Sequence, residues 1–353
     1  MVDTVQSTQR TGLDLDALAG YLHQTAPGLL PPGAADGSAL GAERITGGKS
    51  NLTYRVTGGD QVWAVRRPPL GHVLATAHDM GREFRVMSAL SAAGFPVPRP
   101  ILLCDDPEVI GAPFYLMDFV EGRVYRTADQ TAALGAERAG RITANLIQTL
   151  ARLHAADPDQ LGLADFGRAE GYLERQVRRW TKQLAASDER HLPGFAELPA
   201  RLAAAVPDAH RAALVHGDYR LDNTILAPDD SIAAVVDWEM STLGDPVADL
   251  GLMIVYWDTT PGMPREAVAS AVCPESGFPD GARVAEAYAA ATGADLTDLP
   301  WCVALGCFKL AVIAEGIHLR YSRGQTVGAG FDRIGDMVAP LIDRGHAVLD
   351  SGI

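Results

Sequence analysis

The residues best suited to chemistry lie in two short segments, LVHGDYRLDN at 214–223 and VVDWE at 235–239. Asp218 comes five residues before Asn223, and Asp237 follows Asn223 by fourteen residues, after a strand-like run. Phosphoryl transfer from Mg-ATP requires a carboxylate that accepts the proton of the attacking hydroxyl, together with an Asn and an Asp that hold the metal ion. This spacing predicts Asp218 as the catalytic base and Asn223 and Asp237 as Mg²⁺ ligands.

His216 belongs to the same catalytic segment, where we expect it to brace the loop by hydrogen bonding rather than to act as a base. A purely structural interpretation makes Asp218 and Asp237 turn caps and Asn223 a turn residue. The coincidence of all three residues in register with an apolar strand favours the catalytic interpretation.

A glycine segment, TGGKSN at 46–51, lies between two strand-like runs. Glycines allow backbone amides to approach phosphate oxygens, and the Ser50 hydroxyl and Asn51 can add contacts to the nucleotide. The letters GKS do not make a P-loop, because that motif requires a glycine where this chain has Glu43. The alternative is an ordinary hairpin turn.

The strand WAVR at 63–66 ends in Arg66. Protein kinases place a lysine at the end of such a strand and pair it with a glutamate on the next helix. We therefore expect Arg66 to hold phosphate and Glu83 to be its partner, although the two could instead form a surface ion pair of little energetic value. Arg67 would point to the other face of the strand.

Composition describes an ordinary soluble globular protein of 353 residues, with 47% hydrophobic and 21% charged residues. The net charge of -14 argues against nucleic acid as a partner. The four cysteines show no zinc-binding spacing, and the polar N-terminus does not resemble a signal peptide. The apolar segment 301–317 contains Lys309 and Glu315, so we expect a buried helix rather than a membrane span, and a cytoplasmic protein.

The order of predicted elements indicates an α+β fold with two parts. Strands dominate the first third, around 43–67, 101–104 and 114–119, with helices at 13–25 and 75–93. After Glu121-Gly122 helices dominate, at 137–155, 171–185, 198–205, 284–292 and 299–323, and short strands flank the catalytic segment.

The segments HGDYRLDN and VVDWEMSTLGDPVADLG resemble the aminoglycoside/choline phosphotransferase family. GGKSNLTYRV, AVRRPP, REFRVMSAL, PVPRP, IGAPFYLMDFVEGR and FKLAVIAEGI are similar to one branch of it, the kinase-like domain associated with acyl-CoA dehydrogenases. The resemblance covers nearly the whole chain and implies a protein-kinase-like two-lobed fold. Residues 1–120 would form a small β-rich nucleotide-binding lobe, with 1–12 disordered, and residues 121–353 a larger helical lobe with the catalytic loop and the acceptor pocket.

The resemblance also implies ATP and Mg²⁺ as cofactors and places adenine against backbone groups near Asp118 and Val120. Late helices help to form the acceptor pocket in related phosphotransferases, so Glu315, His318 and Tyr321 are candidates for it. Glu315 could equally pair with His318 three residues on.

Three further carboxylates accompany the catalytic segment. Glu239 is a metal-adjacent or substrate-binding candidate. Asp245 is predicted to cap a helix that begins at Pro246, and Asp249 to be either a solvated first-turn carboxylate or a support of the catalytic loop, which is the role we favour.

Together these features predict an ATP-dependent kinase of small molecules, and the resemblance to the acyl-CoA dehydrogenase-associated branch implies a hydroxy acid or hydroxyacyl-CoA as its acceptor. An aminoglycoside phosphotransferase is the alternative within the same chemistry. A nucleotide-binding pseudokinase without turnover is an alternative of another class, favoured by Arg66 in the usual lysine position and opposed by the intact Asp218, Asn223 and Asp237. Nothing in the sequence supports a flavin dehydrogenase, and the oligomeric state is not encoded in any pattern that we recognise.

Overall fold

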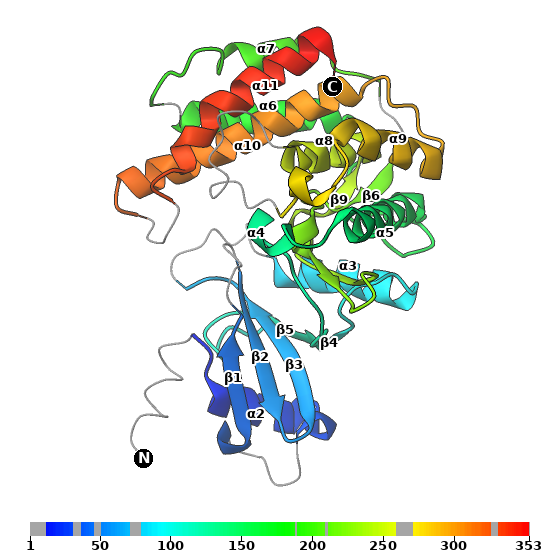
Figure 1. Cartoon of the computed structure of the whole chain (residues 1–353). Coiled ribbons are helices and arrows are strands. Elements are labelled where there is room, and N and C mark those ends of the chain that lie inside the picture. Colours follow the sequence, from blue (N-terminus) through cyan, green and yellow to red (C-terminus); the bar gives the residue numbers. More distant parts are fainter. Residues whose placement is uncertain are drawn as a thin grey trace. The chain divides into compact units, whose positions relative to one another are not determined.

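The structure is a computed structural model that describes residues 12–30, 37–45, 51–70, 79–187, 189–208, 211–258, 271–325 and 331–352. The chain divides into two compact units, residues 1–121 and 122–353, which we call the N-terminal and C-terminal units. The predicted boundary at 120/121 lies one residue from this division. The first unit is built on a sheet and the second mainly on helices, as predicted for an α+β chain (Figure 1).

The N-terminal unit contains a five-stranded antiparallel sheet in the order β1-β2-β3-β5-β4. Its strands are β1 (Leu40–Arg44), β2 (Leu52–Gly58), β3 (Gln61–Arg67), β4 (Pro100–Cys104) and β5 (Phe114–Asp118). Short 3₁₀ helices, η1 (Pro27–Leu29) and η2 (Gly37–Ala39), precede the first strand. Strand β3 therefore lies at the centre of the sheet and pairs with β2 and β5. These two neighbours hold the backbone of Arg66, near the end of β3, in place.

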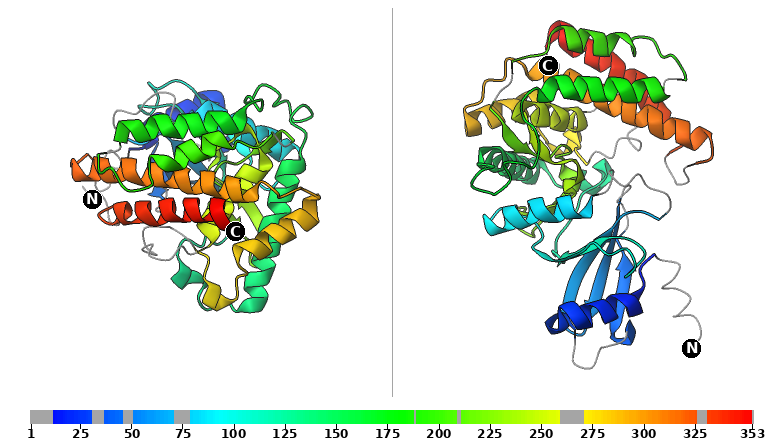
Figure 2. Two further views of the ribbon diagram at one scale, coloured as in Figure 1. Left: turned by 90° about the horizontal axis from the view of Figure 1, so that it is seen from above. Right: turned by 180° about the vertical axis from the view of Figure 1, so that it is seen from behind.

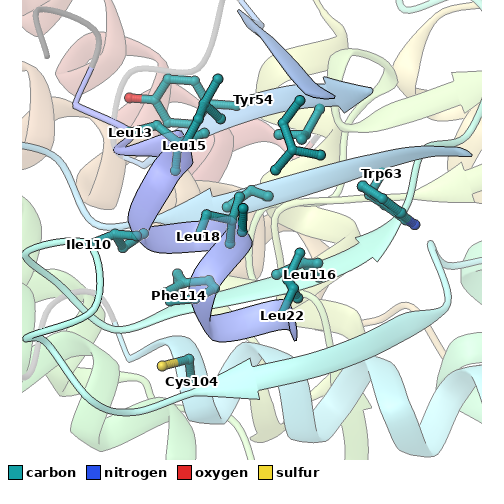
Figure 3. Close-up of a cluster of buried hydrophobic side chains, with 14 of the residues drawn as sticks. Leu13, Leu15, Leu18, Leu22, Tyr54, Trp63, Cys104, Ile110, Phe114 and Leu116 are labelled. Carbon is teal, nitrogen blue, oxygen red and sulfur yellow. The ribbon is translucent and has the colours of Figure 1, made fainter. Parts of the chain in front are cut away.

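Helix α2 (Leu15–Thr25) packs on one face of this sheet, and its leucines join Tyr54, Phe114 and Leu116 in a buried cluster (Figure 3). Side chains alternate across a strand, so the neighbours of these residues point to the opposite face. Helix α3 (Met80–Ala92) lies on that face, where its Glu83 meets the hydroxyl of Tyr115. The alternation sends Arg67 toward the α2 face, where it donates to backbone oxygens of Gly12 and Ile110, as predicted.

The C-terminal unit is mainly helical. Its helices are α4 (Ala128–Thr131), α5 (Ala136–Ala155), α6 (Tyr172–Ser187), α7 (Glu197–Ala204), α8 (Pro246–Trp257), α9 (Gly281–Thr292), α10 (Leu299–Ser322) and α11 (Val338–Ser351), with 3₁₀ helices η5 (Pro274–Ser276) and η6 (Ile334–Met337). Helices α6, α10 and α11 run side by side (Figure 2). The predicted elements did not include α11.

Helix α10 is long and apolar enough to cross a membrane by length and composition, but 67% of its apolar window is buried inside the protein. Such burial is typical of a core helix, as predicted for 301–317. Gly251 of α8 allows a close approach, because a Cβ there would lie 2.7 Å from the carbonyl carbon of Cys302 in α10. Helices α8 and α10 are thus packed tightly together.

Two small antiparallel sheets frame the catalytic segment. One pairs β6 (Ala213–Val215) with β9 (Thr242–Gly244), and the other pairs β7 (Thr224–Leu226) with β8 (Ile232–Val235). The turns between them contain the 3₁₀ helices η3 (Leu221–Asn223) and η4 (Trp238–Met240). Residues 216–223 and 236–241 are therefore loops held at both ends by strands.

Candidate active site

Asp218 and Asn223 meet inside the loop that β6 and β7 delimit. The side-chain amide of Asn223 donates to the backbone oxygen of Asp218 at 2.9 Å and to its carboxylate at 3.0 Å. Asp218 is half-buried and Asn223 is buried. Because the Asn223 amide group is used toward Asp218, its side-chain oxygen faces away from Asp218 and has no hydrogen bond within the described residues.

His216 connects this loop to the next one. Its Nδ1 accepts the backbone N–H of Asp218 at 3.2 Å, and its Nε2 contacts the backbone oxygen of Val236 at 3.0 Å. An acceptor at Nδ1 leaves the proton on Nε2, which then donates to Val236. The ring also packs on Trp238, with centroids 4.6 Å apart. These contacts are the bracing predicted for His216.

Asp249, in the first turn of α8, supports the start of the catalytic loop 216–223. Its carboxylate accepts the backbone N–H groups of His216 at 2.8 Å and of Gly217 at 2.9 Å, and it contacts Nε2 of His154 at 3.2 Å. Burial alone would raise the pKa of Asp249, but the hydrogen bond and charge of His154 bring it below its ordinary value. The residue is only 3% exposed, so the solvated alternative for Asp249 is wrong and the support of the loop is confirmed.

His154 was not singled out from the sequence. Its Nδ1 lies 2.7 Å from the hydroxyl of Tyr288 in α9, and both residues are buried. Asp245 caps α8 through the N–H groups of Val247 and Ala248, as predicted. The loop is thus anchored to α5, α8 and α9 at once.

Asp237 lies at the same end of the β7–β8 hairpin as Asn223. The backbone N–H of Val236 donates to the backbone oxygen of Asn223 at 2.9 Å, which continues the ladder to this end. Asp237 has a left-handed backbone with φ of 69°, and a carboxylate oxygen of Glu239 lies within 4.8 Å of one of its own. Oxygen ligands from an amide and from carboxylates are the set that Mg²⁺ prefers, so these residues fit a divalent cation.

Two more side chains close to Asp218 went unrecognised in the sequence. Tyr256 of α8 adjoins its carboxylate, and burial together with the charge of Asp218 raises the pKa of Tyr256. The guanidinium of Arg220 stacks on the Tyr256 ring at 4.3 Å and pairs with Asp222. The position of Arg220 inside the quoted motif was a signal, but Tyr256 lies in an apolar run that predicts only a buried helix.

In the N-terminal unit, Arg66 and Glu83 form the predicted ion pair, with 2.9 Å between Nε and a carboxylate oxygen. Their side chains are 11% and 2% exposed, so the surface-pair alternative is wrong. Glu83 also accepts from Tyr115 at 2.6 Å and from the Asn51 amide at 3.2 Å. Asn51 is buried and supports Glu83, while Ser50 lies outside the described residues.

The predicted adenine-binding stretch follows β5. The backbone N–H of Asp118 donates to the backbone oxygen of Arg99 at 2.9 Å, and its carboxylate forms an exposed pair with the Arg99 guanidinium. The N–H of Asp118 is therefore already used. Val120 is half-buried, and among the described residues its backbone N–H has no hydrogen-bond partner.

Glu315 does not form the pair with His318 that the sequence suggested. The carboxylate of Glu315 is buried and accepts from Nε of Arg190 at 2.9 Å, because the segment after α6 brings an arginine to this part of α10. The predicted pair of Glu315 with His318 is therefore wrong. The buried carboxylate of Glu315 instead forms an ion pair with Arg190 and is not in an open position that faces an acceptor. His318 packs against Gly335, and Tyr321 is exposed. Tyr321 lies about 18 Å beyond Lys309 along the axis of α10.

The chain is similar to known proteins over most of its length. A model of the phosphotransferase enzyme family matches residues 41–301. The chain is 35% identical over 347 residues to rat acyl-CoA dehydrogenase family member 11. The aligned residues cover 97% of this chain and 44% of that protein. The chain thus spans less than half the length of this relative.

Solved structures extend the comparison to the fold. A Ralstonia eutropha protein that carries the name of an aminoglycoside phosphotransferase superposes with a TM-score of 0.80 at 31% identity, over 96% of this chain and 98% of that chain. The GDP complex of an aminoglycoside 2′-phosphotransferase superposes with a TM-score of 0.64 at 14% identity, over 96% of this chain and 100% of that chain. The fold is therefore kinase-like, as predicted.

Proposed function

The chain belongs to the phosphotransferase enzyme family, and we propose that it transfers the γ-phosphoryl group of ATP to the hydroxyl group of a small molecule. The observation that carries this proposal is the contact between Asp218 and Asn223 on a loop that Asp249 holds through two backbone N–H groups. A carboxylate fixed in this way is preorganised to receive one proton, which is what acceptor activation requires.

In the proposed reaction the Asp218 carboxylate orients the acceptor hydroxyl and takes its proton as the oxygen attacks the γ-phosphorus. The bond from phosphorus to the bridging oxygen of ADP breaks in line with the attack. The protein forms no covalent bond, so its contribution is positioning and charge. His216 and Asp249 keep Asp218 in place and do not touch the substrate.

Asn223 and Asp237 are the proposed ligands of Mg²⁺, with Glu239 beside them. A bound Mg²⁺ supplies positive charge to the phosphate oxygens. The Asn223 oxygen is suited to this role, since its amide group is committed to Asp218. The support is therefore the donor set and its place at one end of the β7–β8 hairpin.

In the N-terminal unit, Arg66 is the proposed phosphate-binding side chain and Glu83 and Asn51 orient it. Arginine can hold two phosphate oxygens at once, unlike the usual lysine. Ser50 is proposed as a further phosphate contact. The backbone at Asp118 and Val120 is proposed to receive adenine, and for Val120 the unpartnered N–H supports this role.

For the acceptor we propose a hydroxylated acid or its CoA thioester. Support comes from the rat relative, whose name places it among acyl-CoA dehydrogenases and whose matched part is similar to this chain. His318 and Tyr321 remain proposed acceptor contacts. An aminoglycoside is the alternative acceptor, supported by the name of the Ralstonia eutropha protein.

The decisive experiment is Mg-dependent transfer of labelled γ-phosphate from ATP, and in parallel from GTP, to short- and medium-chain hydroxy acids, their CoA thioesters, aminoglycosides and choline. Asp218→Asn should lower the transfer by about 10²- to 10⁴-fold, because a positioned base contributes about that much. Asp159→Asn, at an exposed aspartate, is the matched control and should change nothing. Transfer that survives Asp218→Asn would contradict the assigned base.

A second measurement separates the kinase from a pseudokinase module. Arg66→Lys should keep or improve turnover if the chain is a working kinase, since lysine is the usual residue at this position. Absence of turnover in both forms, with measurable ATP binding, would favour the module. Purified protein without flavin absorbance would count against a dehydrogenase.

A further inference from the structure

Lys309 is a charged residue in the buried part of α10. The residues around it in α10, from Leu299 to Phe308 and from Leu310 to Val312, are almost all buried and apolar. Lys309 is half-buried, and its ammonium group donates to the backbone oxygen of Gly217 at 2.7 Å. Burial of a lysine ammonium group costs free energy unless the charge has partners. The contact with Gly217 is therefore an important one for Lys309.

The contact falls on the residue that precedes the catalytic base. The N–H of Gly217 donates to Asp249 of α8 at 2.9 Å, and its carbonyl oxygen accepts from Lys309 of α10. The carboxylate of Asp249 in α8 therefore holds the peptide group before Gly217. The ammonium group of Lys309 in α10 holds the peptide group after it. The second of these peptide groups links Gly217 directly to Asp218.

Gly217 needs such restraint because it is a glycine in an unusual conformation. Its φ is +80°, and a Cβ at this position would lie 2.6 Å from the backbone oxygen of Met240. Only glycine fits here, and glycine is also the residue with the greatest backbone freedom. The peptide group between Gly217 and Asp218 also carries the N–H that donates to Nδ1 of His216 at 3.2 Å, so a shift of this group would disturb the backbone that carries the Asp218 carboxylate.

The surroundings of Lys309 suit an ammonium group. Its Nζ lies 5.7 Å from the centroid of the Trp180 ring, within the range of a cation–π contact. Burial lowers the pKa of Lys309, while the carboxylates of Asp218 and Asp249 favour its charged form and Arg179 opposes it. The ammonium group thus has an aromatic ring, a backbone oxygen and the carboxylates of the catalytic loop and of α8 around it.

We propose that Lys309 is a positioning residue that fixes the peptide group between Gly217 and Asp218, and so sets the orientation of the catalytic carboxylate. This inference rests on the proposed phosphoryl transfer and on Asp218 as its base. A merely structural lysine, which only satisfies a carbonyl group, would affect the stability of the protein but not the turnover of the folded enzyme.

Three variants test the proposal. Lys309→Met keeps the length and removes the donor, and Lys309→Gln keeps a donor without the charge. Lys182→Met, at an exposed lysine of α6, is the matched control. For each variant we would measure kcat, KM for the acceptor, the Kd for ATP, and hydrogen–deuterium exchange of the peptide 214–223.

Lys309→Met should lower kcat by about 10- to 100-fold, as expected for a displaced catalytic group, and leave the Kd for ATP unchanged. Amides in 214–223 should exchange faster, while those elsewhere in the C-terminal unit keep their rates. Lys309→Gln should recover part of the kcat and part of the protection, and Lys182→Met should behave as wild type.

Wild-type kcat and unchanged exchange of 214–223 in Lys309→Met would overturn the proposal. So would faster exchange throughout the unit with an unaltered kcat, which is the result of a structural role. If Lys309→Met does not fold, Lys309→Gln decides by the same two readouts. Exchange needs no acceptor, so a wild-type protein without transfer would count against the proposed function alone and leave this test intact.

Discussion

The side-chain amide of Asn223 bridges the backbone oxygen and the carboxylate of Asp218, at 2.9 and 3.0 Å. One residue therefore both restrains the proposed base and presents an oxygen to the proposed metal. The two functions are coupled, because the amide group must point to Asp218 for the oxygen to point away from it.

Removal of the Asn223 side chain should therefore weaken metal binding and misplace the base together. We expect Asn223→Ala to lower kcat by about 100-fold or more and to raise the Mg²⁺ concentration needed for half-maximal transfer. Kinetics as a function of free Mg²⁺ would measure both effects. Asn145→Ala, which removes a single side-chain hydrogen bond to Asp230, is the control and should leave the Mg²⁺ dependence unchanged.

Gly217→Ala should damage the catalytic loop through sterics alone. The added Cβ would lie 2.6 Å from the Met240 oxygen, and the φ of +80° disfavours any side chain. We expect a loss of about 2 kcal/mol or more in the free energy of unfolding and at least about a 10-fold loss of transfer. Gly140→Ala in α5, where nothing lies within 4 Å, should instead stabilise by about 0.5–1 kcal/mol. Equal effects of the two substitutions in denaturant titrations would contradict this account.

Glu83→Gln tests the buried ion pair of the N-terminal unit. Glu83 is 2% exposed and faces Arg66, so loss of its charge removes the counterion that this pair gives to a buried guanidinium. We expect a cost of about 3–5 kcal/mol in the free energy of unfolding, measured by chemical denaturation. Asp118→Asn breaks the exposed pair with Arg99 and should cost less than about 1 kcal/mol. A cost for Glu83→Gln as small as that of the control would show that Arg66 finds solvent.

Asp230 should make stability depend on pH. It lies in the β7–β8 turn with φ of 68°, a backbone conformation that asparagine also tolerates. Hydrogen bonds from Arg138, and then from Arg141, lower the pKa of this buried carboxyl against the opposing effect of burial. The folded state therefore favours the ionised form, and the resulting stability is complete above the unfolded pKa of about 4 and is lost as the pH falls through the lower folded value.

We accordingly expect Asp230→Asn to be less stable than wild type by about 1–3 kcal/mol near pH 7, with a difference that shrinks below about pH 4. Denaturant titrations from pH 3 to pH 7 would measure it. Asp159→Asn, at an exposed side chain, should follow the wild-type curve. A pH-independent difference between Asp230→Asn and wild type would mean that the two arginines do not act through charge.

Much of the fold could be predicted because the signals are local. The strands of the N-terminal unit and the long apolar α10 follow from periodicity and turn residues, and they appear within a few residues of their expected bounds. The missing α11 shows the limit of this approach, since its pattern near the C-terminus was not assigned. The N-cap of α8 was found because Asp-Pro at a helix start is a strong local signal.

Within the proposed site, Asp218, Asn223 and Asp237 could be recognised from spacing, because one loop and one hairpin bring them together over a short stretch of chain. Their partners could not. Lys309 reaches Gly217 from 92 residues away, and Arg190 reaches Glu315 from 125. Many arginines and lysines of this chain are chemically suited to such contacts, and the packing of α6, α8 and α10 selects which of them meets each acceptor. The candidate catalytic residues can therefore be recognised from their spacing within a short stretch of sequence. The contacts that hold them in place depend on helices that only the folded chain brings together.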